Sequence, residues 1–343
     1  MRVTIKDIAK KTGFAPSTVS LALNNKPFRL PEETRQTIIR TAKEMGYQVN
    51  RTAVNLQRQR SNTIGLIVPD IQNDFYSSLA KGAEHECSKH DWVLIIANSD
   101  NSQEREQKYI QTLYQRNVDG IIMARAAKFE KEPIDNFSEL ATLSIPHVLL
   151  DLSGSKSSNV VVGDHYRAGV EATNYLISKG HRRIACITGD LAFEGAVSRF
   201  QGYKDALAAA NIEFDDSLVF KSDYTLETTQ KVLPSMNLSS FTAVFASNDI
   251  MALAFANFIQ EKGYKIPNDF SIIGYDDTMI AKTMFPPLTT IHQPLLNMGE
   301  DAAKIIISNQ DSSDPQRINY QLNLVERGSV GAPNPIKSIK NEN

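Results

Sequence analysis

The run TIKDIAKKTGFAPSTVSLALN, residues 4–24, decides the fold of the first part of the chain. Thr4 and Asp7 have the spacing of a capping box, although Asp stands where Glu or Gln is usual, so a helix is predicted to begin there. Gly13 supplies a sharp turn after this helix. Pro16 suits the first position of a second helix, because its missing N–H is not needed there. The run therefore predicts two short helices joined by a tight turn.

A third amphipathic helix is predicted to follow Pro31 and to stop at Gly46. Its apolar residues recur at helical spacing, and we expect an inward stripe that consists of Ile38, Ile39, Ala42 and Met45. Three short helices around one small core make a helix-turn-helix domain, which we place at residues 1–49.

The charge of the chain is divided unevenly, although its net value is only −2. The first 60 residues carry 12 Lys and Arg against 4 Asp and Glu, and the remaining residues carry 25 against 35. A basic head on an acidic body is expected where only the head meets a polyanion such as nucleic acid. A solvated basic face would give the same count, so the charge alone leaves both interpretations open.

The composition indicates a cytoplasmic protein with a sizeable core. A length of 343 residues gives room for a small domain and a large one. Cys87 and Cys186 are far apart, which excludes a disulfide framework and a CxxC metal or redox pair. The N-terminus lacks an apolar signal region, and no apolar run approaches the roughly 18 residues of a membrane span, so we expect neither secretion nor a membrane partner.

Residues 4–24, together with EETRQTIIRTAKEMGYQVN at 32–50, closely resemble the DNA-binding head of lac repressor family regulators. The resemblance implies that the second helix enters the major groove of operator DNA and reads bases with Pro16, Ser17 and Leu21. It also implies that the DNA backbone is held by Thr18, Ser20, Asn24, Thr34, Tyr47 and Asn50. Arg is frequent in the family where Leu21 stands, and Ser where Ala15 stands. Leu21 therefore favours contact with a thymine methyl group over the arginine reading of guanine.

The hinge after the head reads NRTAVNLQRQRS, residues 50–61, and has few apolar side chains to bury. Its length allows about two turns of helix, which is marginal for a helix on its own. In the family the matching stretch becomes helical when two copies pair over the operator centre, and Leu56 falls where a leucine wedges into the minor groove. The alternative is a flexible linker in which Leu56 packs on the core. Val54 stands where Arg is usual, which is expected to weaken one backbone contact.

From Thr63 onward, short β-rich runs such as TIGLIVP, WVLIIAN and HVLLD alternate with amphipathic helical stretches. This alternation predicts parallel sheets with right-handed crossovers, whose ligands bind at the carboxyl ends of the strands. Runs such as VDGII, SRFQGYKDAL, SIIGYDDT and PPLTTIHQP resemble the effector-binding core of the same family. The expected architecture is thus an all-α helix-turn-helix head joined by a hinge to an α/β two-lobed core of periplasmic-binding-protein type. By this resemblance the core takes 62–332 and a polar tail takes 333–343, with lobe one at about 62–161 and 293–321 and lobe two at about 162–292 and 322–332.

Polar and aromatic side chains near the strand ends are the candidates for binding an effector. Arg199 matches the family's effector-contacting arginine, whose planar fork can hold two neighbouring hydroxyls. The other candidates are Asp70, Asn73, Phe75, Asp151, Tyr224, Asn248 and Asp276. Their oxygens can accept from sugar hydroxyls, and the rings can lie against the apolar face of a pyranose. The structural alternatives are that Asn248 caps a helix and that Asp276 is a turn residue.

The sequence contains no phosphate loop, dinucleotide fingerprint, zinc-protease motif or nucleophile elbow, so we expect no enzyme, no cofactor and no metal. His85, Cys87 and His90 do not share one helical face, which disfavours a metal site there. We expect a homodimeric repressor of carbohydrate-utilisation genes that binds double-stranded operator DNA under the control of a sugar or sugar phosphate. The alternatives are a regulator that responds to a non-sugar metabolite or a partner protein, a plain sugar-binding protein, and an α/β sugar-processing enzyme.

Overall fold

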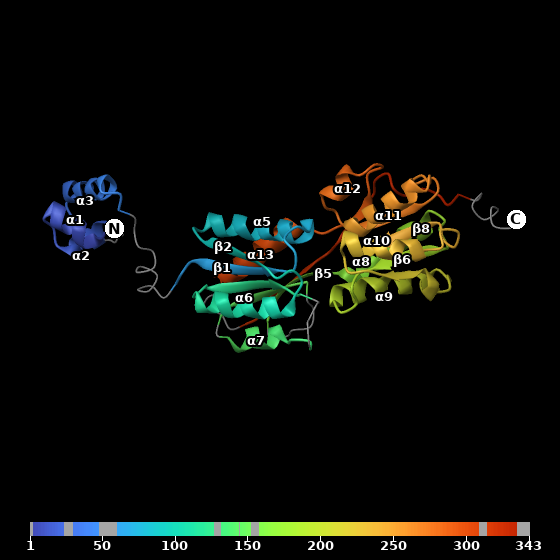
Figure 1. Ribbon diagram of the computed structural model, residues 1–343, viewed down its shortest axis with the longest axis horizontal. Helices are drawn as coiled ribbons and strands as arrows, with labels where there is room; N and C mark the ends of the chain where they lie inside the picture. Colours follow the sequence, from blue (N-terminus) through green and yellow to red (C-terminus); the bar gives the residue numbers. More distant parts are fainter. Residues whose placement is uncertain are drawn as a thin grey trace. The chain divides into compact units, whose positions relative to one another are not determined.

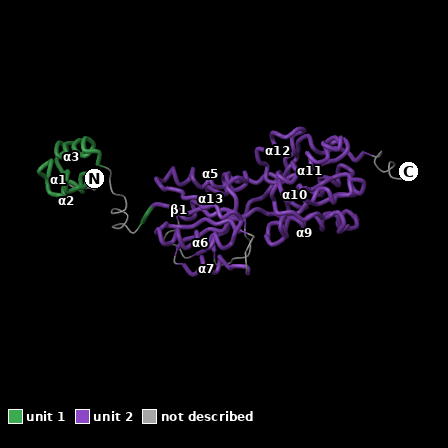
Figure 2. Tube along the Cα trace, in the orientation of Figure 1, with its two compact units in different colours: residues 1–61 green, residues 62–343 purple. Residues whose placement is uncertain are grey.

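The computed structural model divides the chain into two compact units, Met1–Ser61 and Asn62–Asn343 (Figure 2). It describes residues 3–23, 30–47, 60–126, 132–143, 145–151, 158–308 and 314–334. The first unit is helical, and the second contains two sheets with helices on their faces (Figure 1). Several predicted features lie outside the described residues: Asn24, Asn50, Val54, Leu56, most of the hinge at 50–61 and most of the tail at 333–343.

The helices of the first unit, the head, are α1 (Ile5–Thr12), α2 (Pro16–Leu23) and α3 (Glu32–Glu44). The predicted capping box at the start of α1 is confirmed. The Thr4 hydroxyl accepts from the Asp7 amide at 3.4 Å, and the Asp7 carboxylate accepts from the Thr4 amide at 2.9 Å. Gly13 follows with a φ of +74°, a left-handed conformation that suits glycine, and makes the predicted turn into α2.

The core of the head is small. Its buried apolar side chains, among the described residues, are Ile8, Ala9, Val19, Ala22, Ile38 and Ala42. The prediction that Ile39 belongs to the inward stripe is wrong, because its side chain is 40% exposed. Successive residues of a helix are about 100° apart around its axis, so Ile39 turns toward solvent when Ile38 and Ala42 point inward.

The first lobe of the second unit is a parallel sheet with the strand order β11-β5-β4-β3-β1-β2. The strands are β1 (Thr63–Val68), β2 (Val93–Asn98), β3 (Gly120–Ala124), β4 (His147–Leu150), β5 (Asn159–Gly163) and β11 (Arg317–Tyr320). Ile64 and Leu66 of β1 pack under one helical layer, formed by α5 (Asp74–Lys89) and α13 (Leu295–Ser308). Ile67 packs under the opposite layer, formed by α6 (Gln103–Gln115) and α7 (Asn136–Thr142) (Figure 1).

The second lobe has the same layered plan, with the strand order β12-β10-β9-β8-β6-β7. Its strands are β6 (Ile184–Thr188), β7 (Val219–Lys221), β8 (Ala243–Ala246), β9 (Ser271–Asp276), β10 (Thr289–His292) and β12 (Asn323–Val325), of which β12 runs antiparallel to β10. One face carries α8 (His165–Ser178) and α9 (Glu194–Ala209), and the other carries α10 (Leu226–Val232) and α11 (Asp249–Glu261). The short helix α12 (Met279–Thr283) and the 3-10 turns Asp216–Leu218 and Leu233–Ser235 complete the lobe.

The chain passes between the two lobes after Gly163, after His292 and after Tyr320, so each lobe is built from separate stretches of sequence. The prediction of an all-α head and an α/β core with parallel sheets is confirmed. β7, β11 and β12 are absent from the predicted strands. They are three or four residues long and include polar or charged residues, so they lack a run that a pattern could identify.

Two helices of the first lobe, α5 and α13, approach each other closely through glycines. A Cβ on Gly82 would lie 2.0 Å from the Leu296 carbonyl oxygen, and one on Gly299 would lie 2.1 Å from the Leu79 carbonyl oxygen. Both positions therefore need glycine for this packing. Within the described part of the chain, no helix combines the length and the apolar character that crossing a membrane requires.

Candidate functional site

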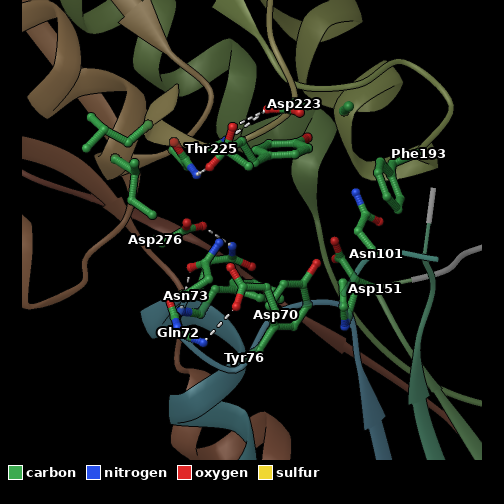
Figure 3. Close-up of a pocket in the computed structure, with 18 of the residues that line it drawn as sticks. Asp70, Gln72, Asn73, Tyr76, Asn101, Asp151, Phe193, Asp223, Thr225 and Asp276 are labelled. Atoms are coloured by element: carbon green, nitrogen blue, oxygen red, sulfur yellow. Dashed lines mark hydrogen bonds between the residues drawn. The ribbon is translucent and has the colours of Figure 1, made fainter. Parts of the chain in front are cut away.

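A cavity of about 590 Å³ lies between the two lobes, at the carboxyl ends of their parallel strands. Asp70 follows β1, Asp151 follows β4, and Asp276 ends β9. All eight side chains that the sequence singles out for an effector line this cavity: Asp70, Asn73, Phe75, Asp151, Arg199, Tyr224, Asn248 and Asp276. Figure 3 shows Asp223 and Thr225 of the second lobe opposite Asp70 and Tyr76 of the first.

Arg199 is buried in α9, and neighbouring groups hold its guanidinium. Its central carbon lies 3.5 Å from the centre of the Tyr275 ring. Nη1 donates to the Ser247 carbonyl, and Nη2 lies 3.3 Å from Nδ1 of His165. Nε is buried without a hydrogen-bond partner among the described residues. Arg199 is thus a lining residue whose guanidinium is held in place by its neighbours, with one unsatisfied buried N–H.

The position of α9 depends on its close approach to α8. A Cβ on Gly169 of α8 would lie 2.2 Å from the carbonyl oxygen of Arg199. Only glycine at this position lets the two helices meet at that distance. Gly169 therefore helps to place Arg199 beside His165, which begins the same helix α8.

The neighbours of His165 determine which of its ring nitrogens carries a proton. A guanidinium can only donate, so Nδ1 of His165 must accept from Arg199. The Tyr275 hydroxyl also lies 2.7 Å from Nδ1, and Nε2 contacts the Asp151 carboxylate. Nε2 therefore carries the proton and donates it to Asp151. Because Asp151 follows a strand of the first lobe and His165 begins a helix of the second, this is a polar link between the lobes.

The pKa values of two carboxyl groups in the cavity shift in opposite directions. Burial would raise the pKa of Asp151, but the neighbouring His165 and Arg199 outweigh it and hold this pKa below its ordinary value. Burial, and then the Asp249 carboxylate, raises the pKa of Asp276 well above its ordinary value. Asp151 is therefore a charged acceptor, whereas Asp276 can also hold a proton and donate it.

Two of the alternatives from the sequence are visible beside the cavity. The amide oxygen of Asn248 caps α11, since it accepts from the Met251 amide at 2.8 Å, while its nitrogen donates to the Tyr224 carbonyl at 3.1 Å. Asn73 caps α5 in the same way, accepting from the Phe75 amide at 3.0 Å. Asp276 is the last residue of β9, and its φ of +107° shows that the backbone leaves the extended conformation there. Capping and lining the cavity are compatible for these residues.

Aromatic rings from both lobes border the cavity. Phe75 and Tyr76 pack edge to face with ring centres 5.0 Å apart in the first lobe, and Phe193 and Tyr224 do so at 6.2 Å in the second. A Cβ on Gly189 would lie 1.9 Å from the Tyr224 ring, so this glycine makes room for the ring.

Other residues line the cavity without having been predicted: Pro69, Gln72, Tyr76, Asp100, Asn101, Phe193, Ala196, Asp223, Thr225, Leu226, Ile250 and Gln293. Asp100 and Asn101 come directly after β2, so the position at a strand end could have found them. Tyr76 lies within α5, and Gln293 lies in the crossing between the lobes. Neither position carries a signal in the sequence.

The candidate DNA-binding residues are accessible to different degrees. Pro16 and Ser17 at the start of α2 are exposed, and Leu21 is half-buried on the same helix. The candidates for the DNA backbone that are described, Thr18, Ser20, Thr34 and Tyr47, are half-buried, and Tyr47 packs against the head core. Asn24, Asn50 and Leu56 lie outside the described residues.

His85 in α5 and His90 at its C-cap each contact a glutamate. His85 lies 2.7 Å from Glu300, and Nε2 of His90 lies 3.2 Å from Glu86. The described stretches contain no group of three or more His, Cys, Asp or Glu side chains placed to hold a metal ion. The contact of His85 with Glu300 connects α5 with α13, and that of His90 with Glu86 is local to the end of α5.

Comparisons with known proteins agree with both parts of the chain. Residues 4–50 match the model of bacterial regulatory proteins of the lacI family, and residues 173–330 match that of periplasmic binding protein-like domains. The HTH-type transcriptional regulator DegA of Bacillus subtilis is 36% identical over 303 residues, which are 88% of this chain and 89% of that protein. The HTH-type transcriptional repressor PurR of Vibrio atlanticus is 32% identical over 336 residues, 95% of this chain and 98% of that one.

The solved structures that are similar include a LacI family transcriptional regulator from Enterococcus faecium with bound ribose. It superimposes with a TM-score of 0.70 at 30% identity, over 78% of this chain and 98% of that chain. These relatives are regulators of transcription and not enzymes, so the alternative of a sugar-processing enzyme is wrong. Regulators of a single family therefore account for both the helix-turn-helix head and the two-lobed core. The chain belongs to the lacI family of bacterial transcriptional regulators.

Proposed function

We propose that this DNA-binding regulator represses genes of carbohydrate use and that a sugar bound between the two lobes sets its affinity for the operator. The convergence of carboxylates, amides, Arg199 and aromatic rings from both lobes on one cavity carries the proposal. A ligand that contacts both lobes binds one arrangement of them better than another, and this difference is what a regulatory ligand needs. The ribose bound to the similar regulator from Enterococcus faecium supports a sugar as the ligand.

The head is proposed to read an operator with α2. Pro16, Ser17 and Leu21 would contact base edges, while Thr18, Ser20, Asn24, Thr34, Tyr47 and Asn50 would hold phosphates. Leu56 of the hinge would wedge into the minor groove and kink the duplex. Leu56→Ala should then bind a selected palindromic operator more weakly than the unaltered protein, in fluorescence anisotropy at several salt concentrations. Equal affinity would refute the wedge.

Exposed apolar side chains support a homodimer. The edge strand β2 exposes Val93, Ile95 and Ile96, and Phe285 in the second lobe is 87% exposed. A bare edge strand with apolar side chains favours pairing with another chain, and a palindromic operator calls for two heads. Ile96→Asp should shift the sedimentation coefficient toward that of a monomer. Val197→Asp, which changes an equally exposed side chain of α9, is the matched control.

The domain limits remain part of the proposal: a head at 1–49, a hinge helix at 50–61, a core at 62–332 and a tail at 333–343. Within the core, we propose lobe one at about 62–161 and 293–321 and lobe two at about 162–292 and 322–332. A regulator of chromosomal genes acts where the DNA is, so we place the protein in the cytoplasm.

Calorimetry with a panel of sugars, followed by operator binding with and without the ligand that binds, tests the proposed function. We expect one sugar to bind and to change operator affinity. Arg199→Lys should weaken that binding, because an ammonium cannot reproduce the planar contacts by which the guanidinium is held against Ser247, His165 and Tyr275 at the cavity wall. Absence of binding across the panel would favour the alternatives, a non-sugar metabolite or a partner protein as the effector.

A further inference from the structure

The charge of the cavity lining is strongly one-sided. Among the described lining residues, the acidic ones are Asp70, Asp100, Asp151, Asp223 and Asp276, and the single cation is Arg199. Even with Asp276 protonated, four carboxylates and one guanidinium line the cavity, and one of the four, Asp100, is paired with Arg105 outside the lining. A phosphate group adds a charge of about −1.5 to −2 near neutral pH. Its repulsion from several carboxylates is strong in a partly desolvated site.

Arg199 is poorly placed to compensate a phosphate. The guanidinium binds anions best as a fork, with two parallel N–H groups aimed at two oxygens. Here one terminal nitrogen donates to the Ser247 carbonyl and the other donates to His165. These two bonds use two of the five N–H groups and hold both ends of the fork against the protein, and the buried Nε N–H has no partner among the described residues.

Helix N-termini, the other common phosphate-binding element, are already occupied around this cavity. Asn73 caps α5, Thr225 caps α10 and Asn248 caps α11, each by accepting from a backbone amide of the first turn. The N-terminus of α9 has no side-chain cap, but Glu194 in its first turn already places a negative charge there.

The unmet hydrogen-bonding capacity fits hydroxyl groups. The carboxylates accept, and the Oε1 atom of Gln293 is a buried acceptor without a donor among the described residues. Arg199 Nε is a donor that needs an acceptor. A hydroxyl can donate and accept at once, whereas a phosphate oxygen near neutral pH mainly accepts.

Resting on the proposed function, we infer that the effector is an uncharged polyhydroxylated molecule, a free sugar or polyol, and that the cavity excludes the phosphate ester of the same compound. The carboxylates would then contribute to specificity in two ways. They would accept hydrogen bonds from ligand hydroxyls, and they would repel anionic analogues. The sequence leaves both a sugar and a sugar phosphate open as the effector, and this inference selects the sugar.

The test is calorimetric titration of the full chain with free pentoses, hexoses, disaccharides and polyols, each beside its commercially available phosphate ester. We expect at least one free compound to bind, and its ester to bind about a hundredfold more weakly at low salt. A phosphate ester that binds as tightly as its parent, or more tightly, would overturn the inference while leaving a sugar-responsive regulator intact. If neither set binds, the proposed sugar effector fails, and the inference fails with it.

A pair of isosteric variants separates the cavity charge from the charge of the whole protein. Asp70→Asn keeps the oxygen that accepts from the Gln72 amide at 2.9 Å but removes one negative charge from the cavity. Asp205→Asn removes the same charge from α9, where Asp205 accepts from Tyr166 and Gln201 and does not line the cavity. We expect only Asp70→Asn to reduce the ratio of ester to parent dissociation constants. An equal effect of both variants, or none of Asp70→Asn, would refute exclusion by the cavity carboxylates.

Discussion

Ile38→Ala should strongly destabilise the head while leaving the core intact. Ile38 is completely buried in a head core with few apolar side chains. Truncating such an isoleucine to alanine costs about 2 to 5 kcal/mol, because burial is lost and a cavity remains. At about 0.05 to 0.15 kcal/mol per residue, a unit of 61 residues has a total free energy of unfolding of about 3 to 9 kcal/mol. The substitution therefore removes a large part of the stability of the head.

Thermal unfolding followed by calorimetry, with operator binding and effector titration on the same samples, measures this effect. We expect a lower melting temperature for the head, weaker operator binding and an unchanged effector affinity of the core. Ile39→Ala is the matched control, since Ile39 is adjacent and 40% exposed. We expect it to change the free energy of unfolding of the head by no more than about 0.5 kcal/mol. Equal destabilisation by the two variants, or weaker effector binding by Ile38→Ala, would refute the reasoning.

Three further substitutions test the core. His165→Gln keeps a donor toward Asp151 but loses the Nδ1 acceptor for Arg199. We expect the variant to bind the effector about tenfold to a hundredfold more weakly in calorimetry. An unchanged dissociation constant would contradict the assignment of Nδ1 as the acceptor. Burial raises the pKa of Glu106 from 4.5 to about 7, so the folded core holds this proton more tightly than the unfolded chain. The free energy of unfolding of the core should therefore fall as the pH rises from about 4.5 to 7. At about 1.36 kcal/mol per pH unit, the fall is up to about 3 kcal/mol. Urea titrations across this pH range should show a smaller fall in Glu106→Gln. Gly169→Ala should lower both the melting temperature of the core and its affinity for the effector, because the added Cβ would lie 2.2 Å from the Arg199 carbonyl oxygen. A melting temperature equal to that of the unaltered protein would exclude the close approach of α8 and α9.

The parts that local rules govern could be predicted from the sequence. The capping box of Thr4 and Asp7 involves only neighbouring residues, and the structure forms it as predicted. Asp151 and Asp276 each stand at the carboxyl end of a parallel strand, where ligands of such sheets bind, and the carboxyl ends of the two sheets border the same cavity.

The features that depend on tertiary contacts could not be predicted. Ile39 is apolar and next to a core residue, yet the direction of its side chain is decided by how α3 packs. Gln293 and Tyr76 reach the cavity only because the lobes meet there, and nothing in their own neighbourhood indicates it. His165 contacts Arg199, 34 positions away, and Tyr275, 110 positions away, and no local pattern records such contacts.

The order in which the chain supplies its strands has a consequence for synthesis on the ribosome. The first lobe needs α13 and β11 from the last part of the chain, and Gly82 of α5 lies directly against α13. Until those residues emerge, a nascent chain exposes the apolar side of α5 and of the sheet beneath it. The second lobe lacks only β12 at that stage. The lobe whose translation begins first therefore stays open until nearly the whole chain has been made, and the apolar surface that it exposes in the meantime favours aggregation.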